Sequence, residues 1–353
     1  MTAPAATAPA RVERGWGKLL LAILAFVVVP TVPQFRALLP VEHTVVLLLP
    51  ALAVCGLIGW WAGGRLTLAL AFVALATYAI SQRPDVPSVF VNLQDGWSLL
   101  LAGAFGLVCL FGMRRPLFLR GLVAATVALV LALVMSALGP VSNAEVHKAI
   151  STELTARNTD TMNRLNTFIG QYPDDWNRLV KTVPQLGEVP AETQRELGSL
   201  AHAGTVLYPS LLLLESLVAL AIAWATYHRL GRARLGPPLA PLREFRFNDQ
   251  LVWGLLIGLA IYFVPVLSKF DIFGQNLLVF FGALYAVRGL GVLSWFLAPG
   301  ALAVAGAVGF LMLLAPFLNA VAVLGFLLLA IAAFGLGLGD TWADWRNRAR
   351  PTT

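Results

Sequence analysis

Residues 117–138 read LFLRGLVAATVALVLALVMSAL, and this stretch decides the class of fold. It holds one charged residue, Arg120, and about 20 apolar residues in a helix are enough to cross the hydrocarbon core of a bilayer. Similar apolar runs recur along the chain near 17–30, 44–62, 65–80, 97–112, 205–228, 249–268, 274–297, 300–316 and 318–338. We therefore expect an all-α, polytopic transmembrane helical bundle with about ten spans. Nine is the alternative, because the first run stops early at Pro30.

The composition supports a membrane protein and excludes other classes. Of the 353 residues, 58% are hydrophobic and only 12% are charged, whereas soluble domains carry roughly 25% charged residues. A soluble enzyme, a nucleic-acid-binding domain and a secreted disulfide scaffold are excluded on this ground. Cys55 and Cys109 lie inside apolar runs, so we expect buried thiols and neither a disulfide nor a metal site.

The basic residues predict the orientation of the bundle. With the N-terminus inside, the short loops and tails place fifteen bases in the cytoplasm and three outside. The inside set is Arg11, Arg14, Lys18, Arg65, Arg114, Arg115, Arg120, Arg229, Arg232, Arg234, Arg243, Arg246, Arg346, Arg348 and Arg350; the outside set is Arg36, Arg83 and Lys269. Lys and Arg concentrate on the cytoplasmic side of membrane proteins. Both termini are therefore expected in the cytoplasm.

The long polar stretch at 139–204 is expected outside the cytoplasm. Val146, Ile150 and Leu154 follow one another at intervals of four, which is the spacing of an amphipathic helix, and Met162, Leu165 and Phe168 continue a similar stripe. We expect two or three short amphipathic helices on the outer membrane face or capping the bundle, peripheral to its folding. The predicted parts are 1–138, an N-terminal membrane half of five spans; 139–204, the extracytoplasmic segment; and 205–353, a second half of five spans with a basic cytoplasmic loop at 229–247 and a cytoplasmic tail.

Two ionisable residues fall inside predicted spans, and they define the candidate site. Glu215 and Arg288 lie on helices that both run from outside to inside, at depths of ~15 and ~21 Å for a rise of 1.5 Å per residue. A charge at the centre of a bilayer costs at least ~2.5–3.5 kcal/mol, so a Glu215–Arg288 ion pair is the expected solution. The pair is either structural or, with Asn276 at the start of the eighth span, the lining of an intramembrane polar site.

No catalytic signature accompanies these residues. The chain has no zinc-protease, P-loop or nucleophile-elbow motif, and its four histidines, His43, His147, His202 and His228, are scattered. We expect no catalytic residue, no metal and no cofactor, and a protein that is not an enzyme.

Several stretches resemble the YybS-like bacterial membrane proteins, a family of unknown function. They are Pro50 to Arg65, Tyr208-Pro-Ser-Leu-Leu-Leu-Leu-Glu215, Phe247-Asn-Asp-Gln-Leu-Val-Trp-Gly254, Asn276-Leu-Leu with Tyr285 and Gly289, and Gly339-Asp-Thr-Trp-Ala-Asp-Trp-Arg346. The likeness covers most of the chain and implies a multi-pass protein of the bacterial inner membrane. A more distant likeness to the substrate-binding membrane subunits of energy-coupling vitamin transporters implies a small-molecule pocket. Arg288 departs from the family pattern, which has an uncharged polar residue there.

Three functions fit these observations. The first is transport or solute binding within the bundle, around Glu215, Arg288 and Asn276. The second is a structural or assembly role through partner membrane proteins, and the third is an integral-membrane enzyme acting on lipid-linked sugars. The expected partners are a small-molecule ligand, membrane proteins and, at loop 229–247, anionic lipid headgroups, which attract arginines near a membrane. No nucleic-acid partner is expected.

Overall fold

The computed structural model describes residues 15–82, 88–111, 115–139, 142–231, 235–298, 300–314 and 318–345. These residues form fourteen α-helices joined by turns and short 3-10 helices, and no strand occurs among them. The predicted all-α class is therefore confirmed for the described part of the chain. Some of the basic residues from which the orientation is predicted lie outside the described residues: Arg11, Arg14, Arg83, Arg114, Arg232, Arg234, Arg346, Arg348 and Arg350.

The contacts divide the chain into two compact units, Met1–Leu239 and Ala240–Thr353. The first contains α1 (Gly17–Val28), α2 (Pro33–Leu38), α3 (Val45–Trp61), α4 (Leu66–Ser81), α5 (Val89–Phe111), α6 (Leu117–Leu138), α7 (Asn143–Gln171), α8 (Pro173–Thr182), α9 (Val189–Val206) and α10 (Tyr208–Leu230). The second contains α11 (Val252–Phe263), α12 (Asp271–Phe296), α13 (Ala301–Leu314) and α14 (Asn319–Ala343). The predicted three-part division concerns the membrane topology, which these contacts do not test, and it stays a prediction.

Every one of the ten apolar runs is occupied by a helix. Five helical segments are long and apolar enough to cross a membrane: Val89–Phe111, Leu117–Leu138, Tyr208–Leu230, Pro265–Phe296 and Val321–Ala343. Five more apolar helices of 10–17 residues occupy Gly17–Thr31, Val45–Trp61, Leu66–Ser81, Asp249–Phe263 and Ala301–Leu313. The sequence pattern thus predicts the helices well.

Helix α10 supplies much of the core of the first unit. Its side chains Trp224, Tyr227 and Leu220 are almost completely buried, and the helix packs against α3, α6 and α1. Cys55 on α3 and Cys109 on α5 are buried free thiols in the same core, as their apolar surroundings predict.

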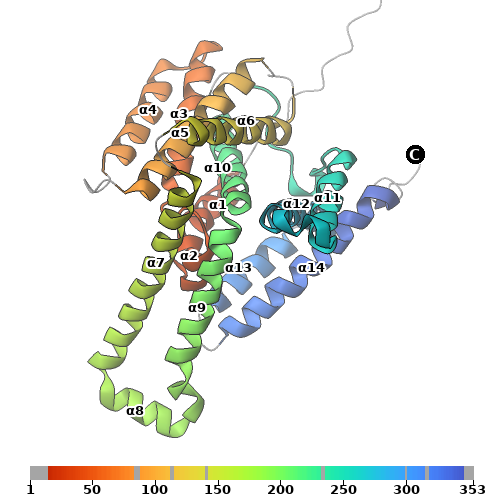
Figure 1. Cartoon of the computed structure of the whole chain (residues 1–353). Helices are drawn as coiled ribbons and strands as arrows, with labels where there is room; N and C mark the ends of the chain where they lie inside the picture. Colours follow the sequence, from red (N-terminus) through yellow and green to blue (C-terminus); the bar gives the residue numbers. More distant parts are fainter. Residues whose placement is uncertain are drawn as a thin grey trace, which may run out of the picture. The chain divides into compact units, whose positions relative to one another are not determined.

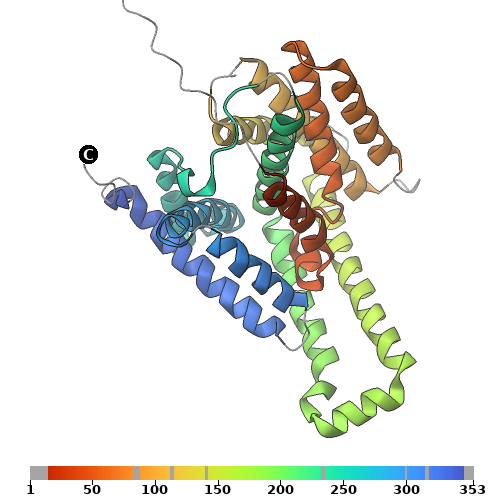
Figure 2. The same cartoon turned by 180° about the vertical axis from the view of Figure 1, so that it is seen from behind.

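Helices α7 and α9 form a long hairpin that α8 closes at its far end (Figures 1 and 2). Helix α7 begins with a capping box, in which the Ser142 side chain accepts from the Glu145 N–H and the Glu145 carboxylate accepts from the Ser142 N–H. This arrangement satisfies free backbone donors at the start of the helix. The same hydrogen bonds from Ser142 hold the pKa of Glu145 below its usual value.

The hairpin corrects two expectations. Helix α7 has 29 residues and α9 has 18, so the helices of 139–204 are not all short. Nor is the segment peripheral, because Ile150, Leu154 and Ala201 belong to the hydrophobic core of the first unit. A side-chain carbon on Gly204 would lie 2.9 Å from the carbonyl oxygen of Leu38, so only glycine lets α9 approach α2 this closely.

In the second unit, α12 and α14 cross in close contact. The crossing uses two glycines, Gly289 on α12 and Gly337 on α14. A side-chain carbon at Gly289 would collide with the carbonyl oxygen of Ala333, and one at Gly337 with that of Tyr285. Small residues that allow backbones to approach are the usual means of packing helices in membranes.

Candidate functional site

Glu215 lies on α10 and is 6% exposed. Its Oε2 accepts a hydrogen bond of 3.1 Å from the backbone N–H of Val41, while Oε1 is buried and has no hydrogen-bond partner among the described residues. The next residue, Ser216, accepts a hydrogen bond from Nε1 of Trp97 on α5. The sequence argument that placed Glu215 inside the bundle therefore identified a buried carboxylate.

The segment around Val41 is held from two further helices. Arg157 on α7 donates from Nη1 to the carbonyl oxygen of Leu39 at 3.0 Å and from Nη2 to that of Pro40 at 3.4 Å. Gln94 on α5 also donates to the Pro40 carbonyl, at 2.9 Å. Residues 39–41 thus connect the hairpin to α5 and α10.

Arg157 is itself almost fully buried, at 4% exposure of its side chain. Its Nε lies 3.1 Å from a carboxylate oxygen of Glu153 and 3.5 Å from one of Glu42, and its guanidinium carbon lies 5.3 Å from the ring centre of Phe90. The two carboxylates balance the buried charge, which would otherwise be costly to remove from water.

A second arginine extends this network at its more exposed side. Arg36 on α2 contacts Glu42 at 2.9 Å and Asp160 on α7 at 2.7 Å. The hydrogen bond from Arg36, together with one from Arg164, holds the pKa of Asp160 below its usual value. We call this group the base of the hairpin; it consists of Arg36, Glu42, Glu153, Arg157 and Asp160.

Arg288 has its partners within the second unit. Its Nε lies 3.0 Å from Oδ2 of Asp340 on α14, and its Nη1 lies 2.6 Å from Oδ1 of Asp249. Asp340 is fully buried, and Phe247 stacks near the guanidinium at 5.4 Å.

The predicted Glu215–Arg288 ion pair would join residues of the two units, and because the contacts within each unit do not test it, it stays a prediction. Asp340 and Asp249 balance the charge of Arg288 within the second unit, so Arg288 does not need Glu215 as a counter-ion, whereas Glu215 has only the Val41 N–H as a hydrogen-bond donor among the described residues. Asn276, the third predicted site residue, donates its side-chain N–H to the carbonyl oxygen of Ile272 on its own helix. That hydrogen bond stays within α12, and the predicted grouping of Asn276 with Glu215 and Arg288 stays a prediction.

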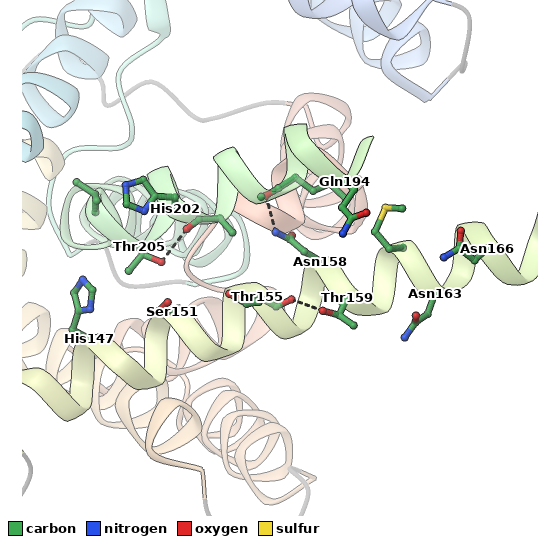
Figure 3. A pocket seen from close by; sticks show the side chains of 15 residues that line it. His147, Ser151, Thr155, Asn158, Thr159, Asn163, Asn166, Gln194, His202 and Thr205 are labelled. Atoms are coloured by element: carbon green, nitrogen blue, oxygen red, sulfur yellow. Dashed lines mark hydrogen bonds between the residues drawn. The ribbon is translucent and has the colours of Figure 1, made fainter. Parts of the chain in front are cut away.

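A pocket of about 570 Å³ lies between α7 and α9, within the hairpin (Figure 3). Its lining is rich in hydroxyl and amide side chains, among them Ser151, Thr155, Asn163 and Gln194. Asn158 crosses from α7 to α9 by donating to the carbonyl oxygen of Leu197 at 2.6 Å. Small-molecule sites commonly have volumes of about 300–1,000 Å³, so this pocket has the size for one.

Two of the four histidines meet at this pocket. His147 on α7 and His202 on α9 both line the end nearer to Thr205 (Figure 3). Their sequence spacing did not predict this, because 55 positions separate them and only the hairpin brings them to one pocket. Within the described ranges, no group of three or more His, Cys, Asp or Glu residues could hold a metal ion.

Two residues of these polar clusters, Arg157 and Asp340, were not predicted from the sequence. Arg157 lies three positions after Leu154 and so continues the stripe of Val146, Ile150 and Leu154, which is the signal that could have placed it on the buried face. Asp340 follows the last apolar run by two positions, and α14 extends past it to Ala343.

Apolar helices long enough to cross a bilayer, further short apolar helices and buried ion pairs together define a multi-pass α-helical membrane protein. The chain belongs to the family described as predicted membrane protein (DUF2232), whose model matches residues 123–327, more than half of its length. This match confirms the expectation of a membrane protein family of unknown function. Neither the comparison with curated proteins nor that with solved structures gives a match.

Proposed function

We propose that the protein is a bacterial inner-membrane protein with about ten spans, both termini in the cytoplasm and the α7–α9 hairpin outside. The ten apolar helices support the span count, and the excess of bases on one side supports the orientation. The five short helices need tilting or local thinning of the bilayer to cross it. The arginines of loop 229–247 would then face anionic lipid headgroups.

Within this topology, the proposed function is the binding of a small polar solute, as a solute-binding or transport protein. The observation that carries the proposal is the pocket between α7 and α9, with its volume of about 570 Å³ and its hydroxyl, amide and imidazole lining. A hairpin outside the membrane would offer this pocket to solutes before they reach the bundle.

The lining also indicates the class of solute. Among the fifteen residues that line the pocket, none carries a carboxylate, an ammonium or a guanidinium group. A cationic ligand would lose hydration there without gaining a counter-charge, and an anionic one would gain a counter-charge only from a protonated His147 or His202. Hydroxyls and amides both donate and accept hydrogen bonds, so the expected ligand is uncharged and polar, such as a polyol, a sugar or an amide. We propose binding without chemical conversion, and hence not an enzyme.

The test uses two glycines of the hairpin. Gly198 lines the pocket and Gly170 does not, and a side-chain carbon at either position meets no other atom within 4 Å. Gly198→Leu should therefore fill the pocket, while Gly170→Leu adds the same side chain elsewhere on the hairpin. The measurement is native mass spectrometry of the purified proteins, followed by identification of small molecules released on unfolding. The proposal expects a polar adduct on wild type and Gly170→Leu that Gly198→Leu lacks. Equal adducts on all three, or none on any, would count against it.

A second candidate function is favoured by the far end of the hairpin. Phe168, Tyr172, Leu179 and Val183 lie there with more than two fifths of each residue exposed. Such residues on a hairpin outside the membrane suit contact with a partner membrane protein in an assembly role.

A further inference from the structure

Glu215 is a buried carboxyl group with too few hydrogen bonds for an anion. Val41 supplies one donor, to Oε2, and no described group donates to Oε1. An ionised carboxylate away from water needs several donors or an adjacent cation, and without them the neutral form is favoured. A protonated carboxyl carries no charge to balance: Oε2 as the carbonyl oxygen accepts from Val41, and Oε1 carries the proton, for which the described residues provide no acceptor. The unmet O–H costs less than an unbalanced buried anion.

Arg157 is the basic residue that could neutralise an ionised Glu215, but its hydrogen bonds go to other groups. Arg157 interacts electrostatically with Glu215, but its hydrogen bonds go to Glu153 and to the carbonyl oxygens of Leu39 and Pro40. In the arrangement described, Arg157 is therefore not available as the counter-ion of an ionised Glu215.

Other titratable groups on the elements around Glu215 do not change this balance. Tyr208 lies two turns earlier on the same face of α10, and its hydroxyl is buried without a hydrogen-bond partner in the described part of the chain. Glu42 and Glu153 accompany Arg157. The helices in contact with α10 contribute Lys18 on α1, Cys55 on α3, Asp95 and Cys109 on α5, Arg120 on α6, and Glu192, Arg195, Glu196 and His202 on α9. None of these is hydrogen-bonded to Glu215 within the described residues.

We propose that Glu215 is a proton-binding site, neutral in this structure, whose ionisation is coupled to the base of the hairpin. Ionisation releases the Oε1 proton to water and leaves an anion that requires a cation. Arg157 is the group that can turn to it, and doing so withdraws its hydrogen bonds from Leu39 and Pro40. Since Asn158, the next residue, lines the pocket and holds α7 to α9, this movement reaches the pocket.

The coupling concerns a different ligand, the proton, and does not depend on the proposed solute. Its elements are contiguous: Glu215, Val41, the two carbonyl groups before it, and α7. Such a connection becomes evidence of coupling only when a change at one end is measured at the other.

The first experiment detects the proton itself. Infrared spectra of the wild-type protein in nanodiscs at neutral pH should contain a protonated-carboxyl C=O band that Glu215→Gln loses. Glu196→Gln, a change at an exposed glutamate of α9, should retain it. If Glu215→Gln does not fold, Glu215→Asp should shift the band instead of removing it. Spectra in which neither change at 215 alters a protonated-carboxyl band would overturn the proposal.

The second experiment measures the coupling, with no solute added. Hydrogen exchange of peptides covering 36–46 and 153–161 is followed as the pH is raised and corrected for intrinsic rates. We expect exchange to increase with pH in the wild type and in Glu196→Gln, and this dependence to be lost in Glu215→Gln. The same pH dependence in Glu215→Gln as in the wild type would contradict coupling. Because the readout involves no solute, an empty pocket would refute the proposed function and leave this result unaffected.

Discussion

The backbone N–H of Val41 donates to Oε2 of Glu215 across 3.1 Å, joining positions 174 residues apart. One residue before Val41, the Pro40 carbonyl accepts from Arg157 of the hairpin and from Gln94 of α5. A short connection between α2 and α3 thereby joins three helices. The hairpin is consequently part of the first unit and not an attachment to it.

Replacing Arg157 should destabilise the first unit strongly. Arg157→Met leaves Glu42 and Glu153 without their common cation and removes the Arg157 hydrogen bonds to the Leu39 and Pro40 carbonyl groups, of which Pro40 keeps the one from Gln94; about 3 kcal/mol is the expected loss. The estimate is at the lower end of the usual range because Glu42 keeps 24% exposure of its side chain. Thermal unfolding in detergent measures the effect.

Arg164→Met is the matched control for this prediction. The Arg164 side chain is 74% exposed and pairs with Asp160 on the same helix, a kind of pair worth at most about 1 kcal/mol. Equal destabilisation by both changes would show that the burial of Arg157 does not matter.

The sequence predicts the local features of this protein and misses its long-range ones. The ten apolar runs could be predicted as helices because the hydropathy and residue spacing of a run are read from that one segment. The position of Glu215 along its span was enough to predict that it is buried. The partners of Arg288 could not be read in this way, because Asp340 is 52 positions distant and belongs to another helix. The stripe that ends at Leu154 could have placed Arg157 on the buried face of its helix, but its contacts with residues 39 and 40 join distant positions and could not be read from the sequence. The pocket likewise exists only because α8 returns the chain and α9 lies beside α7.

Arg288 and Asp340 should behave as a coupled pair. Asp340→Leu leaves Arg288 with only the more exposed Asp249, and a loss of about 3 kcal/mol is expected. Adding Arg288→Met should recover much of this loss, because no unbalanced buried charge remains. A thermal-stability cycle on the two single variants and the double variant gives the coupling energy.

The corresponding cycle on Arg246 and Asp344, an exposed pair at 2.8 Å, should give a coupling of at most about 1 kcal/mol. Additive effects at Arg288 and Asp340 would refute their pairing. The same cycle on Glu215→Gln and Arg288→Met tests the predicted Glu215–Arg288 pair, which effects that add within about 0.5 kcal/mol would contradict.

Two nearby glycines of α14 should respond oppositely to alanine. At Gly335 a side-chain carbon meets nothing within 4 Å, so Gly335→Ala should stabilise the helix by up to about 1 kcal/mol. At Gly337 the carbon collides with the Tyr285 carbonyl oxygen, and Gly337→Ala should destabilise the unit by about 1–3 kcal/mol through overpacking. Thermal unfolding of the two variants is the measurement, and stabilisation by both would exclude the close crossing of α12 and α14.

Acidification should loosen the base of the hairpin through Asp160. The hydrogen bonds from Arg36 and Arg164 lower the pKa of this carboxyl in the folded protein, so its stabilising effect is present above the ordinary aspartate pKa. The effect is lost as the pH falls through the lowered value. Unfolding midpoints across an acidic pH series should therefore fall less steeply in Asp160→Asn than in the wild type. Asp174→Asn, at the exposed start of α8, should keep the wild-type slope; an Asp160→Asn slope equal to it would contradict the prediction.

A solute pocket on the outer side of the membrane must be reachable from outside the cell, so a cysteine placed in it should react in intact cells. Ser151 lines the pocket, and the native Cys55 and Cys109 are fully buried, so the wild type serves as the blank. With a membrane-impermeant maleimide, Ser151→Cys should be labelled in intact cells, and Arg243→Cys in the inner loop only after the membrane is permeabilised. Labelling of Ser151→Cys only after permeabilisation would place the pocket in the cytoplasm and contradict the proposed outer location of the hairpin.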